Sequence, residues 1–540
     1  MATTSAAVRD SDRRWLRVIV ALAALPPLAL AAAEAYLFGD LTGFPLDDAW
    51  IHLVFARSLA GGEGLAFDAG HQVAGSTAPL WTALLSLLFL LPGPVAVWTK
   101  LAGLAAHLWS VGLTFTVGRR LGLTAARAAL AAGLVALTDS LIWSSLSGME
   151  VPLFTALTLA GLARHLEERR APGAAPLSFL LFGLAALARP EGLLLVLLAA
   201  ADRALVARGD ARGLTISVAA LRRVAVGLLV AAAVVVPVGV VYLVISGSPL
   251  PTTLGAKSSG PPGLVPELRF LDAIFSLLFA SQPLPALLAA GGAVTLVRRL
   301  GTPRDAGLLP VLWCFGLPVA SAMLSSGNEL LIGNFGRYFF PLAPFVVLLG
   351  VLALDGVELA RLRALRIGRL ALPVGVVVAL ALLVGPPALR AVRGGAMALQ
   401  ARANVEDADL AAARWLERNV APDALLGLCD IGLVKWLRPN PVVDLAGIVS
   451  PGRREFLARA ERERGLPWPN ALYLWLEQER PEYVVVYPAW FPLLDAEPRR
   501  FPVRHRIAVP NNVAMAGDEL VIYATPWTRP DPAARSRGVR

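Results

Sequence analysis

Charge, cysteine and lysine are scarce in this sequence. Only 16% of its 540 residues are charged, while 56% are hydrophobic, and only three of its 49 basic residues are lysines. This composition excludes a single soluble core and is typical of a polytopic membrane protein. The two cysteines, Cys314 and Cys429, have no metal-type spacing, so we expect neither a disulfide nor a cysteine-based metal site.

The net charge of +10 does not indicate a nucleic-acid-binding protein. The basic residues are nearly all arginines in short clusters between apolar runs, which is the positive-inside pattern of membrane topology. We therefore expect membrane lipids among the partners and no nucleic acid.

Hydrophobic runs and arginine clusters together predict about 11 membrane spans. The run at 78–93 is expected to lie along the interface, because every arginine cluster between spans then falls in the cytosol. The runs at 176–188 and 191–206 are too short to cross a core of ~30 Å, so the turn between them is expected inside the bundle. The spans are placed at 15–38, 96–118, 123–139, 150–163, 176–188, 191–206, 224–246, 283–297, 306–325, 338–354 and 370–389.

This topology predicts a protein of the cytoplasmic membrane with its N-terminus in the cytosol. Residues 1–390 are expected to form a transmembrane module whose first outer loop covers 39–95, and the first apolar run is expected to remain as an uncleaved span. The more polar residues 391–540 are expected to form a small extracytoplasmic α/β domain. Its strands are predicted in DALLGLCDIG, PEYVVVYPAW, VRHRIAV and ELVIYAT.

Two adjacent acids, Asp47 and Asp48, stand at the start of the first outer loop. A carboxylate pair at a membrane border is costly unless it binds a cation, pairs with a base or moves a proton. We predict that this pair is the reaction centre, where one carboxylate accepts a proton from an acceptor hydroxyl and the other orients it or holds a divalent cation. The alternative is a pair of helix N-terminal acids favoured by the helix dipole.

Glu150 begins a predicted span and is expected at the same outer face. With Asp48 it is a candidate ligand of a divalent cation (Mg, Mn or Ca), and the alternative is again a helix N-terminal acid. His52 and Arg57 are neighbours that could support substrate or metal, but the sequence favours ordinary polar contacts for His52 and a structural partnership with a nearby acid for Arg57.

Three basic residues are candidates for binding a donor phosphate, since Arg and Lys are the usual partners of phosphate. Lys257 follows an outer loop, and Arg337 lies at the outer mouth of a span. Arg189 stands in the Arg-Pro-Glu-Gly turn between two short runs. Their alternatives are lipid anchoring by snorkelling and, for Arg189, neutralisation by Glu191.

Several motifs of the chain, taken in order, resemble those of the GT-C fold glycosyltransferases. They are DDA at 47–49 followed by FARSLAGGEGLAFDAGHQVAGSTAPLW, then SGME at 147–150, ARPEG at 188–192, PTTLGAK at 251–257 and GRYFFP at 336–341. DIG at 430–432 with VVDLAGIVSP at 442–451 resembles the start of the outer domain in the nearest type. That type is the bacterial group similar to the terminal arabinofuranosyltransferases of mycobacterial cell walls.

The resemblance implies transfer of one sugar from a polyprenyl-phosphate donor to a hydroxyl of a cell-envelope glycan, lipid or protein, outside the cytoplasmic membrane. It implies that Asp47 is the base and that Lys257 and Arg337 hold the lipid phosphate. Direct displacement with inversion needs one base and no nucleophile, in agreement with the lack of a Ser/His/Asp or Cys/His set in the sequence. His71 and Ala74 depart from the family, whose loop often carries acids there.

Two other classes of protein are compatible with the composition. A transporter or flippase of lipid-linked sugars would be expected to show charges within several spans and repeated halves, whereas here the charges gather at one face and no repeat is visible. A non-catalytic membrane protein that binds a cell-wall polymer would tolerate the loss of Asp47 but not of its C-terminal domain.

Overall fold

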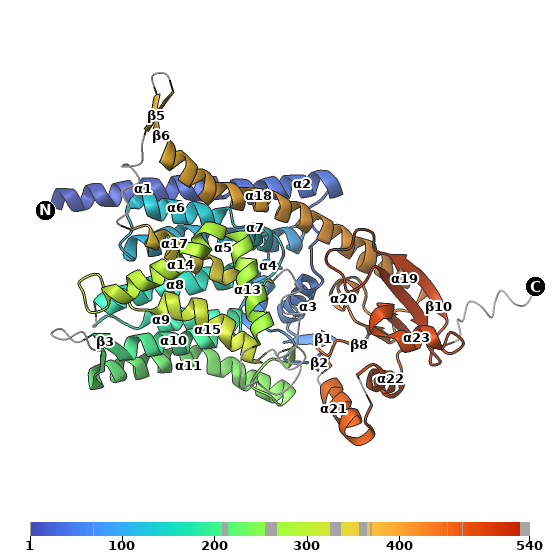
Figure 1. The fold of residues 1–540 in the computed structure, drawn as a ribbon. Helices are drawn as coiled ribbons and strands as arrows, with labels where there is room; N and C mark the ends of the chain where they lie inside the picture. Colours follow the sequence, from blue (N-terminus) through green and yellow to red (C-terminus); the bar gives the residue numbers. More distant parts are fainter. Residues whose placement is uncertain are drawn as a thin grey trace, which may run out of the picture.

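The structure is a computed structural model that describes residues 2–68, 70–171, 173–207, 214–253, 267–324, 336–355, 364–367, 370–450, 452–466 and 468–529. Figure 1 shows a bundle of helices with a smaller α/β unit at one end, joined by the long helix α18 (Val374–Val405). The N-terminus lies at the end of the bundle away from that unit.

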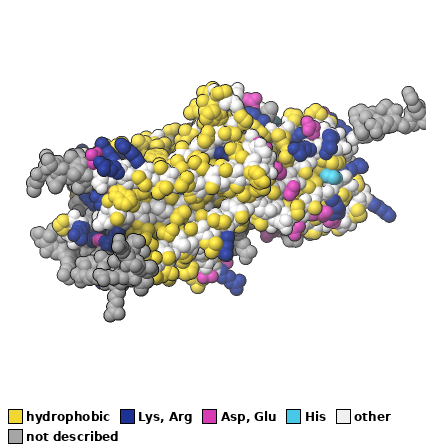
Figure 2. All heavy atoms as spheres, turned by 90° about the horizontal axis from the view of Figure 1, so that it is seen from above, with side chains coloured by type: hydrophobic (Ala, Val, Ile, Leu, Met, Phe, Trp, Pro, Cys, Tyr) yellow, Lys and Arg dark blue, Asp and Glu magenta, His cyan; other side chains and the backbone are white. Residues whose placement is uncertain are grey.

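The helices of the bundle have apolar side chains both at their contacts with one another and on the outer surface of the bundle. Figure 2 shows hydrophobic side chains over much of the bundle's visible surface, with charged side chains gathered toward its ends. Such an all-round apolar helix bundle is expected of membrane spans. The helices are α1 (Ala2–Ala23), α2 (Leu25–Phe38), α5 (Val95–Arg120), α6 (Ala125–Ala136), α7 (Asp139–Ser145), α8 (Val151–Arg170), α9 (Leu177–Ala188), α10 (Gly192–Ala204), α11 (Val218–Ser246), α13 (Leu268–Ser281), α14 (Pro283–Arg299), α15 (Leu309–Leu324), α17 (Ala343–Ala353) and α18.

Three helical stretches in the described part of the chain are long and apolar enough to cross a membrane: Asp10–Phe38, Val95–Arg120 and Val218–Ser246. The number rises to five if two bent pairs each count as one span, α6 with α7 at 62° and α13 with α14 at 113°. The other apolar helices have 10–17 residues. The total of about 11 spans therefore remains a prediction, although most predicted segments coincide with helices.

The boundaries of the short segments agree closely with the prediction. The run at 78–93 forms α4 (Pro79–Leu88), whose ten residues extend only about 15 Å and cannot cross the hydrocarbon core. The helices α9 and α10 flank the turn at Arg189, as predicted. The predicted domain boundary at 390 falls inside α18, which continues into the α/β unit.

The α/β unit is organised around a five-stranded sheet of order β10-β11-β9-β7-β8. Strand β7 runs parallel to β8 and β9, while β11 is antiparallel to β9 and β10. The four predicted strands are confirmed, and a fifth, β8, joins them. The elements are α19 (Ala411–Asn419), β7 (Leu426–Leu428), α20 (Gly432–Leu437), β8 (Val442–Asp444), α21 (Gly452–Arg464), α22 (Trp468–Glu479), β9 (Tyr483–Val486), α23 (Pro492–Ala496), β10 (Val503–Ala508) and β11 (Glu519–Ala524).

Helix α3 (Asp48–Ala60) lies between the bundle and the α/β unit and contributes to both cores. One set of its side chains packs into the bundle core: Ala49, Trp50, Leu53 and Ala56. The other set packs into the core of the α/β unit: Ile51, Val54 and Phe55. The hairpin β1 (Ala66–Asp68) and β2 (His71–Gln72) follows it, and Asp68 forms an ion pair with Lys435. The segment from α3 to β2 therefore contributes to the cores or contacts of both parts.

Candidate active site

The two adjacent aspartates at the start of α3 have different partners. Asp47 accepts hydrogen bonds from the backbone N–H groups of Gly432 and Leu433, at 2.7 and 2.6 Å. Its carboxylate therefore binds the free N–H groups at the N-terminus of helix α20. Asp48 forms an ion pair with Arg337. Consecutive residues on a helix point about 100° apart, which explains the divergence. The pair therefore reaches the α/β unit with one carboxylate and the bundle with the other.

A second group of charges lies beside this pair, at the ends of three helices. Glu150, which precedes α8, accepts a hydrogen bond from Arg189 Nη1 at 2.6 Å and lies 3.3 Å from His52 Nε2. Arg189 also donates from Nη2 to Glu191 at 2.7 Å. Arg189 is thus neutralised by Glu191, which was the alternative drawn from the sequence, and it also binds Glu150.

Tyr338 joins the two groups. The guanidinium carbon of Arg189 lies 4.7 Å from the centre of its ring, and that of Arg337 lies 5.4 Å away, so both cations face aromatic electron density. Arg189, Arg337, Glu150 and His52 each expose at most 5% of their surface. We call Asp48, His52, Glu150, Arg189, Glu191, Arg337 and Tyr338 the charged cluster.

Two buried guanidinium nitrogens of this cluster, Nη1 of Arg337 and Nε of Arg189, lack a hydrogen-bond partner in the described part of the protein. The same holds for His52 Nδ1, Glu150 Oε2 and Glu191 Oε2. Buried polar groups in native proteins are nearly always bonded, so such donors need an explanation, and an anionic ligand is one. The arrangement can thus present cationic N–H groups to a phosphate.

The local sequence explains how these side chains are positioned. Gly148 has a φ of +78°, and a Cβ there would lie 2.8 Å from the Cβ of Ala49, so the Ser-Gly-Met-Glu turn packs tightly on α3. The Nε1 of Trp81 donates to the Gly148 carbonyl at 2.9 Å. Arg189 has an extended backbone because Pro190 follows it, and this ends α9 at the position from which its side chain reaches Glu150.

The electrostatic surroundings of Asp47 come from the α/β unit. Burial, and then the charge of Asp430, raise the pKa of Asp47 to about 8, although its two backbone hydrogen bonds act in the opposite direction. Burial also raises the pKa of Asp430 to about 6, while the Tyr487 hydroxyl donates to it at 2.6 Å. Burial and the charges of Asp430 and Asp47 raise the pKa of Asp409.

Sequence reasoning missed these two acids. The sequence analysis names Asp430 only within the DIG segment and does not single out Asp409. The only sequence signal was the DIG segment, since a residue directly after a buried parallel strand lies at the sheet edge where sites are built. Asp409 lies in a π-helical turn (Glu406–Leu410) that interrupts the helical path from α18 to α19, and such turns are frequent at functional sites.

Besides Asp47, whose hydrogen bonds go to α20, two predicted site residues are not part of the charged cluster. Arg57 donates to the Trp436 carbonyl at 3.0 Å, and its guanidinium carbon lies 4.6 Å from the centre of that indole ring, so it links α3 to α20. Lys257 lies outside the described residues. Its motif begins beside the first outer loop, since Thr252 donates from N to the Ala74 carbonyl at 2.9 Å and from Oγ1 to Ile448 at 2.7 Å.

The comparisons with known proteins concern the fold. Residues 397–528 match a family described as a domain of unknown function (DUF8728). A search of curated proteins gave no match. ArnT from Cupriavidus metallidurans, solved in the apo state, matches with a TM-score of 0.56 and 16% identity, and the match covers 96% of this chain and 100% of that one.

The archaeal oligosaccharyltransferase AglB from Archaeoglobus fulgidus, solved with an inhibitory peptide and a dolichol-phosphate, has a TM-score of 0.52 at 12% identity, over 96% of this chain and 75% of that one. A structure of the Archaeoglobus fulgidus oligosaccharyltransferase with Zn and sulfate has a TM-score of 0.50 at 13% identity, over 95% and 74%. At such identities the likeness shows the fold. The resemblance seen in the motifs is thus confirmed at that level: the chain has the fold of the GT-C glycosyltransferases.

Proposed function

We propose that the protein transfers a single sugar from a polyprenyl-phosphate donor to an acceptor hydroxyl of a cell-envelope glycan, lipid or protein. The observation that carries the proposal is the charged cluster, which occupies the junction of a GT-C bundle and an α/β unit. A lipid-linked sugar has a hydrocarbon tail for the bundle and a polar head for such a junction. The dolichol-phosphate named with AglB belongs to the same chemical class as the proposed donor.

Asp47 is the proposed base. It takes the proton of the acceptor hydroxyl while that oxygen forms a bond to the anomeric carbon, and the bond from that carbon to the phosphate oxygen breaks on the opposite side. The phosphate leaves with the electron pair, so the anomeric configuration inverts. A pKa near 8 suits this role, because a base is most effective when its pKa lies near the working pH.

The departing phosphate is proposed to meet Arg337 and Arg189, with Lys257 as a third cation. Each of the two arginines has a buried donor that no described residue satisfies. Asp48 holds Arg337 in place and is a positioning residue in this scheme. The preformed donors stabilise negative charge as it develops on the leaving group, which is the main source of catalysis in such sites.

A divalent cation was predicted with Asp48 and Glu150 as ligands. In the structure each of these carboxylates is already neutralised by an arginine, and the described residues contain no group of three or more His, Cys, Asp or Glu side chains arranged for a metal. The present donor set therefore does not fit a preformed metal site. No step above depends on one.

The arrangement in the membrane is part of the proposal. The arginine clusters support a cytosolic N-terminus, with the charged cluster and the α/β unit outside the cytoplasmic membrane. Labelling of single cysteines introduced into the α/β unit and near the N-terminus, with a membrane-impermeant reagent on intact cells, would check this. Labelling of the N-terminal site alone would show that the orientation is the reverse of the proposed one.

The test of function is sugar transfer by the purified protein with a panel of polyprenyl-phosphate pentofuranose and hexose donors. Asp47→Asn is expected to lower the rate by about 10²–10⁴-fold, the usual contribution of a general base. Asp48→Asn, which keeps the size but loses the charge that holds Arg337, is expected to raise the donor KM as well. An Asp47→Asn protein as active as wild type would move the base elsewhere, and no transfer from any donor would favour a transporter or a polymer-binding protein.

A further inference from the structure

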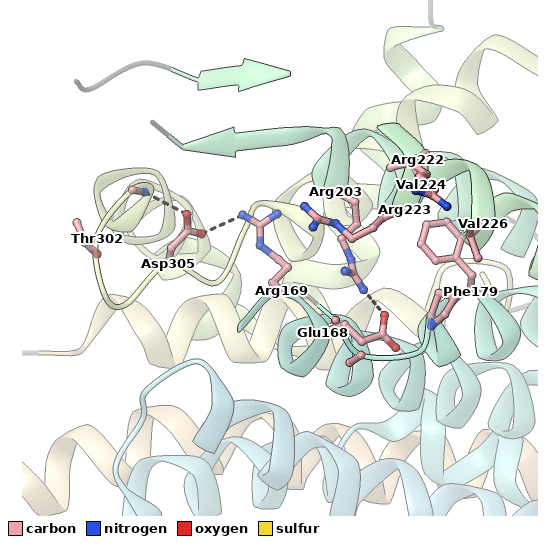
Figure 3. A pocket seen from close by; sticks show the side chains of 14 residues that line it. Glu168, Arg169, Phe179, Arg203, Arg222, Arg223, Val224, Val226, Thr302 and Asp305 are labelled. Carbon is pink, nitrogen blue, oxygen red and sulfur yellow. Dashed lines mark hydrogen bonds and ion pairs between the residues drawn. The ribbon is translucent and has the colours of Figure 1, made fainter. Parts of the chain in front are cut away.

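A cavity of about 480 Å³ lies at the end of the bundle away from the charged cluster. It is lined by residues of α8, α9, α10 and α11 and by the connection from α14 to α15. Figure 3 shows how four arginines and two acids surround it: Arg169, Arg203, Arg222, Arg223, Glu168 and Asp305. We call this the arginine pocket.

Two of the four arginines are neutralised by acids. Arg203 forms an ion pair with Glu168, and Arg169 forms one with Asp305 at 3.2 Å, as the dashed lines of Figure 3 indicate. Glu168 is further held by the backbone N–H of Ser178 at 2.8 Å. These pairs build a fixed inner wall with little net charge.

The other two arginines come from α11 and are exposed. Neither Arg222 nor Arg223 forms an ion pair or a hydrogen bond with any residue that the structure describes. Both line the cavity, and the charge of Arg223 acts on the half-buried Arg203. Among the described side chains that line the pocket, the basic ones exceed the acidic ones by two, and Asp202, which does not line it, also pairs with Arg169. A cavity with unneutralised cations attracts an anion.

The apolar surroundings indicate the kind of anion. Helix α11 presents large exposed hydrophobic side chains around the two arginines, among them Val218, Leu221 and Val226. Phe179 and Val224 line the pocket itself. An acyl chain can lie along the outside of α11 while a charged head enters the pocket, and basic pockets between membrane helices are known to bind anionic head groups in this way.

The position of the pocket agrees with a lipid head group. Glu150 of the charged cluster directly precedes α8, and Glu168 lies in the last turn of the same helix, so the two sites are about 27 Å apart along its axis at 1.5 Å per residue. This is close to the ~30 Å thickness of the hydrocarbon core. When the charged cluster is at one membrane surface, the arginine pocket is at the other.

Close packing of α9 against α11 keeps the pocket in shape. A Cβ at Gly227 of α11 would lie 2.5 Å from the ring of Phe179, and one at Gly183 of α9 would lie 3.3 Å from the Ala231 backbone. Small residues let membrane helices approach this closely. The arginines of α11 are therefore carried by a rigid interface.

We propose that the arginine pocket binds a phosphate group, with Arg222 and Arg223 as its ligands. An anionic lipid head group and a soluble phosphate share this chemistry, and the apolar face of α11 favours the lipid. The site is separate from the proposed reaction, because it lies at the opposite end of the bundle.

The test is native mass spectrometry of the full-length protein in detergent, titrated with phosphatidylglycerol, phosphatidylcholine or inorganic phosphate. Wild type is expected to retain phosphatidylglycerol, and Arg222→Gln with Arg223→Gln is expected to weaken that binding at least tenfold. The matched control is Arg13→Gln with Arg14→Gln, which removes the same charge from exposed arginines at the same end of the bundle. This control is expected to bind as wild type does.

Equal loss in both double variants, or no loss in either, would overturn the proposal. Binding of inorganic phosphate as tight as that of phosphatidylglycerol, and sensitive to the same variant, would support the phosphate site and assign it to a soluble ligand. Arg222→Lys with Arg223→Lys keeps the charge and is expected to retain most of the binding. Its failure to bind, with the protein still folded, would also count against the proposal.

Discussion

The two ends of helix α8 carry charge in opposite ways. At its start, Glu150 is buried and shared between Arg189 and His52, and neighbouring cations are likewise matched with acids. At its far end, Arg222 and Arg223 are exposed and have no acid partner in the described structure. Buried charges must be paired because desolvation is expensive, whereas exposed charges can remain unpaired until a ligand arrives.

The difference separates a preorganised site from a receptive one. In the charged cluster the acids hold the arginines in fixed positions, so a transition state would meet oriented donors without further rearrangement. In the arginine pocket the same residue type is left free to follow a ligand. Removing charge should therefore damage the first site structurally and the second only in its binding.

The largest effect is expected from Glu150→Gln. It removes one of the two acids that neutralise the buried Arg189, the other being Glu191, and breaking a buried pair in this way costs up to about 3–5 kcal/mol. The measurement is thermal unfolding in detergent together with sugar transfer, both of which should fall sharply. Glu167→Gln is the matched control, since Glu167 is on the same helix and pairs with Arg164 and Arg120 while exposing 38% of its side chain. Its loss should cost about 1 kcal/mol for each of these partly exposed pairs at most.

A smaller effect is expected from the acids that face Asp47. Transfer should increase as the pH rises through about 8, because Asp47 must lose its proton before it can act as a base. Asp430→Asn removes the charge that raises the pKa of Asp47 and keeps an acceptor for the Tyr487 hydroxyl. The midpoint of the pH–rate profile should shift downward by about one unit. An unchanged midpoint would show that another group titrates.

The raised pKa of Asp47 also affects the stability of the folded protein. Because the pKa of Asp47 is higher in the folded protein than in the unfolded chain, the folded state binds the proton more tightly. The contribution of this group to stability is therefore fully present below the unfolded pKa of about 3.9 and is lost as the pH rises through about 8. Asp47→Asn should flatten this dependence in unfolding experiments between pH 6 and 9. A wild-type slope in the variant would contradict the assignment.

The smallest effect on folding is expected at the arginine pocket. Arg222→Gln with Arg223→Gln alters exposed, unpaired side chains, so the free energy of unfolding without added lipid should change by no more than about 0.5 kcal/mol. Sugar transfer with a saturating donor should also be retained. A large loss of stability in the absence of anionic lipid would show that these arginines have a structural role, and the contrast between the two ends of α8 would disappear.

Local patterns predicted the bundle well where a break in hydrophobicity coincided with a helix end. The Arg-Pro-Glu-Gly turn was placed correctly because a proline and two charges interrupt an apolar run. Helix α13 was not predicted as the first half of a bent pair, and α18 proved longer than its apolar part. The span count depends on the membrane as much as on helix lengths, and so no local pattern fixes it.

The candidate site was only partly predictable, for a similar reason. Motifs at the ends of apolar runs brought Asp48, Glu150, Arg189 and Arg337 to one place, since helix ends on one face must meet. The partners of Asp47 could not be foreseen, because Gly432 and Asp430 are nearly 400 residues away in the chain and approach it only through the folding of a sheet. The contact of Arg57 with Trp436 could not be foreseen for the same reason, as Trp436 also belongs to that unit.

Helix α3 has an implication for how this architecture can be modified. Its side chains complete two cores at once, so the α/β unit is not an interchangeable cap, although residues 397–528 alone match a family. A chimaera that replaced only the C-terminal segment would pair a foreign surface with Ile51, Val54 and Phe55. The unit that can be exchanged between proteins is discontinuous in sequence, because it consists of the C-terminal unit together with the segment from Phe44 to Trp81. A chimaera is expected to fold only when both parts are transferred.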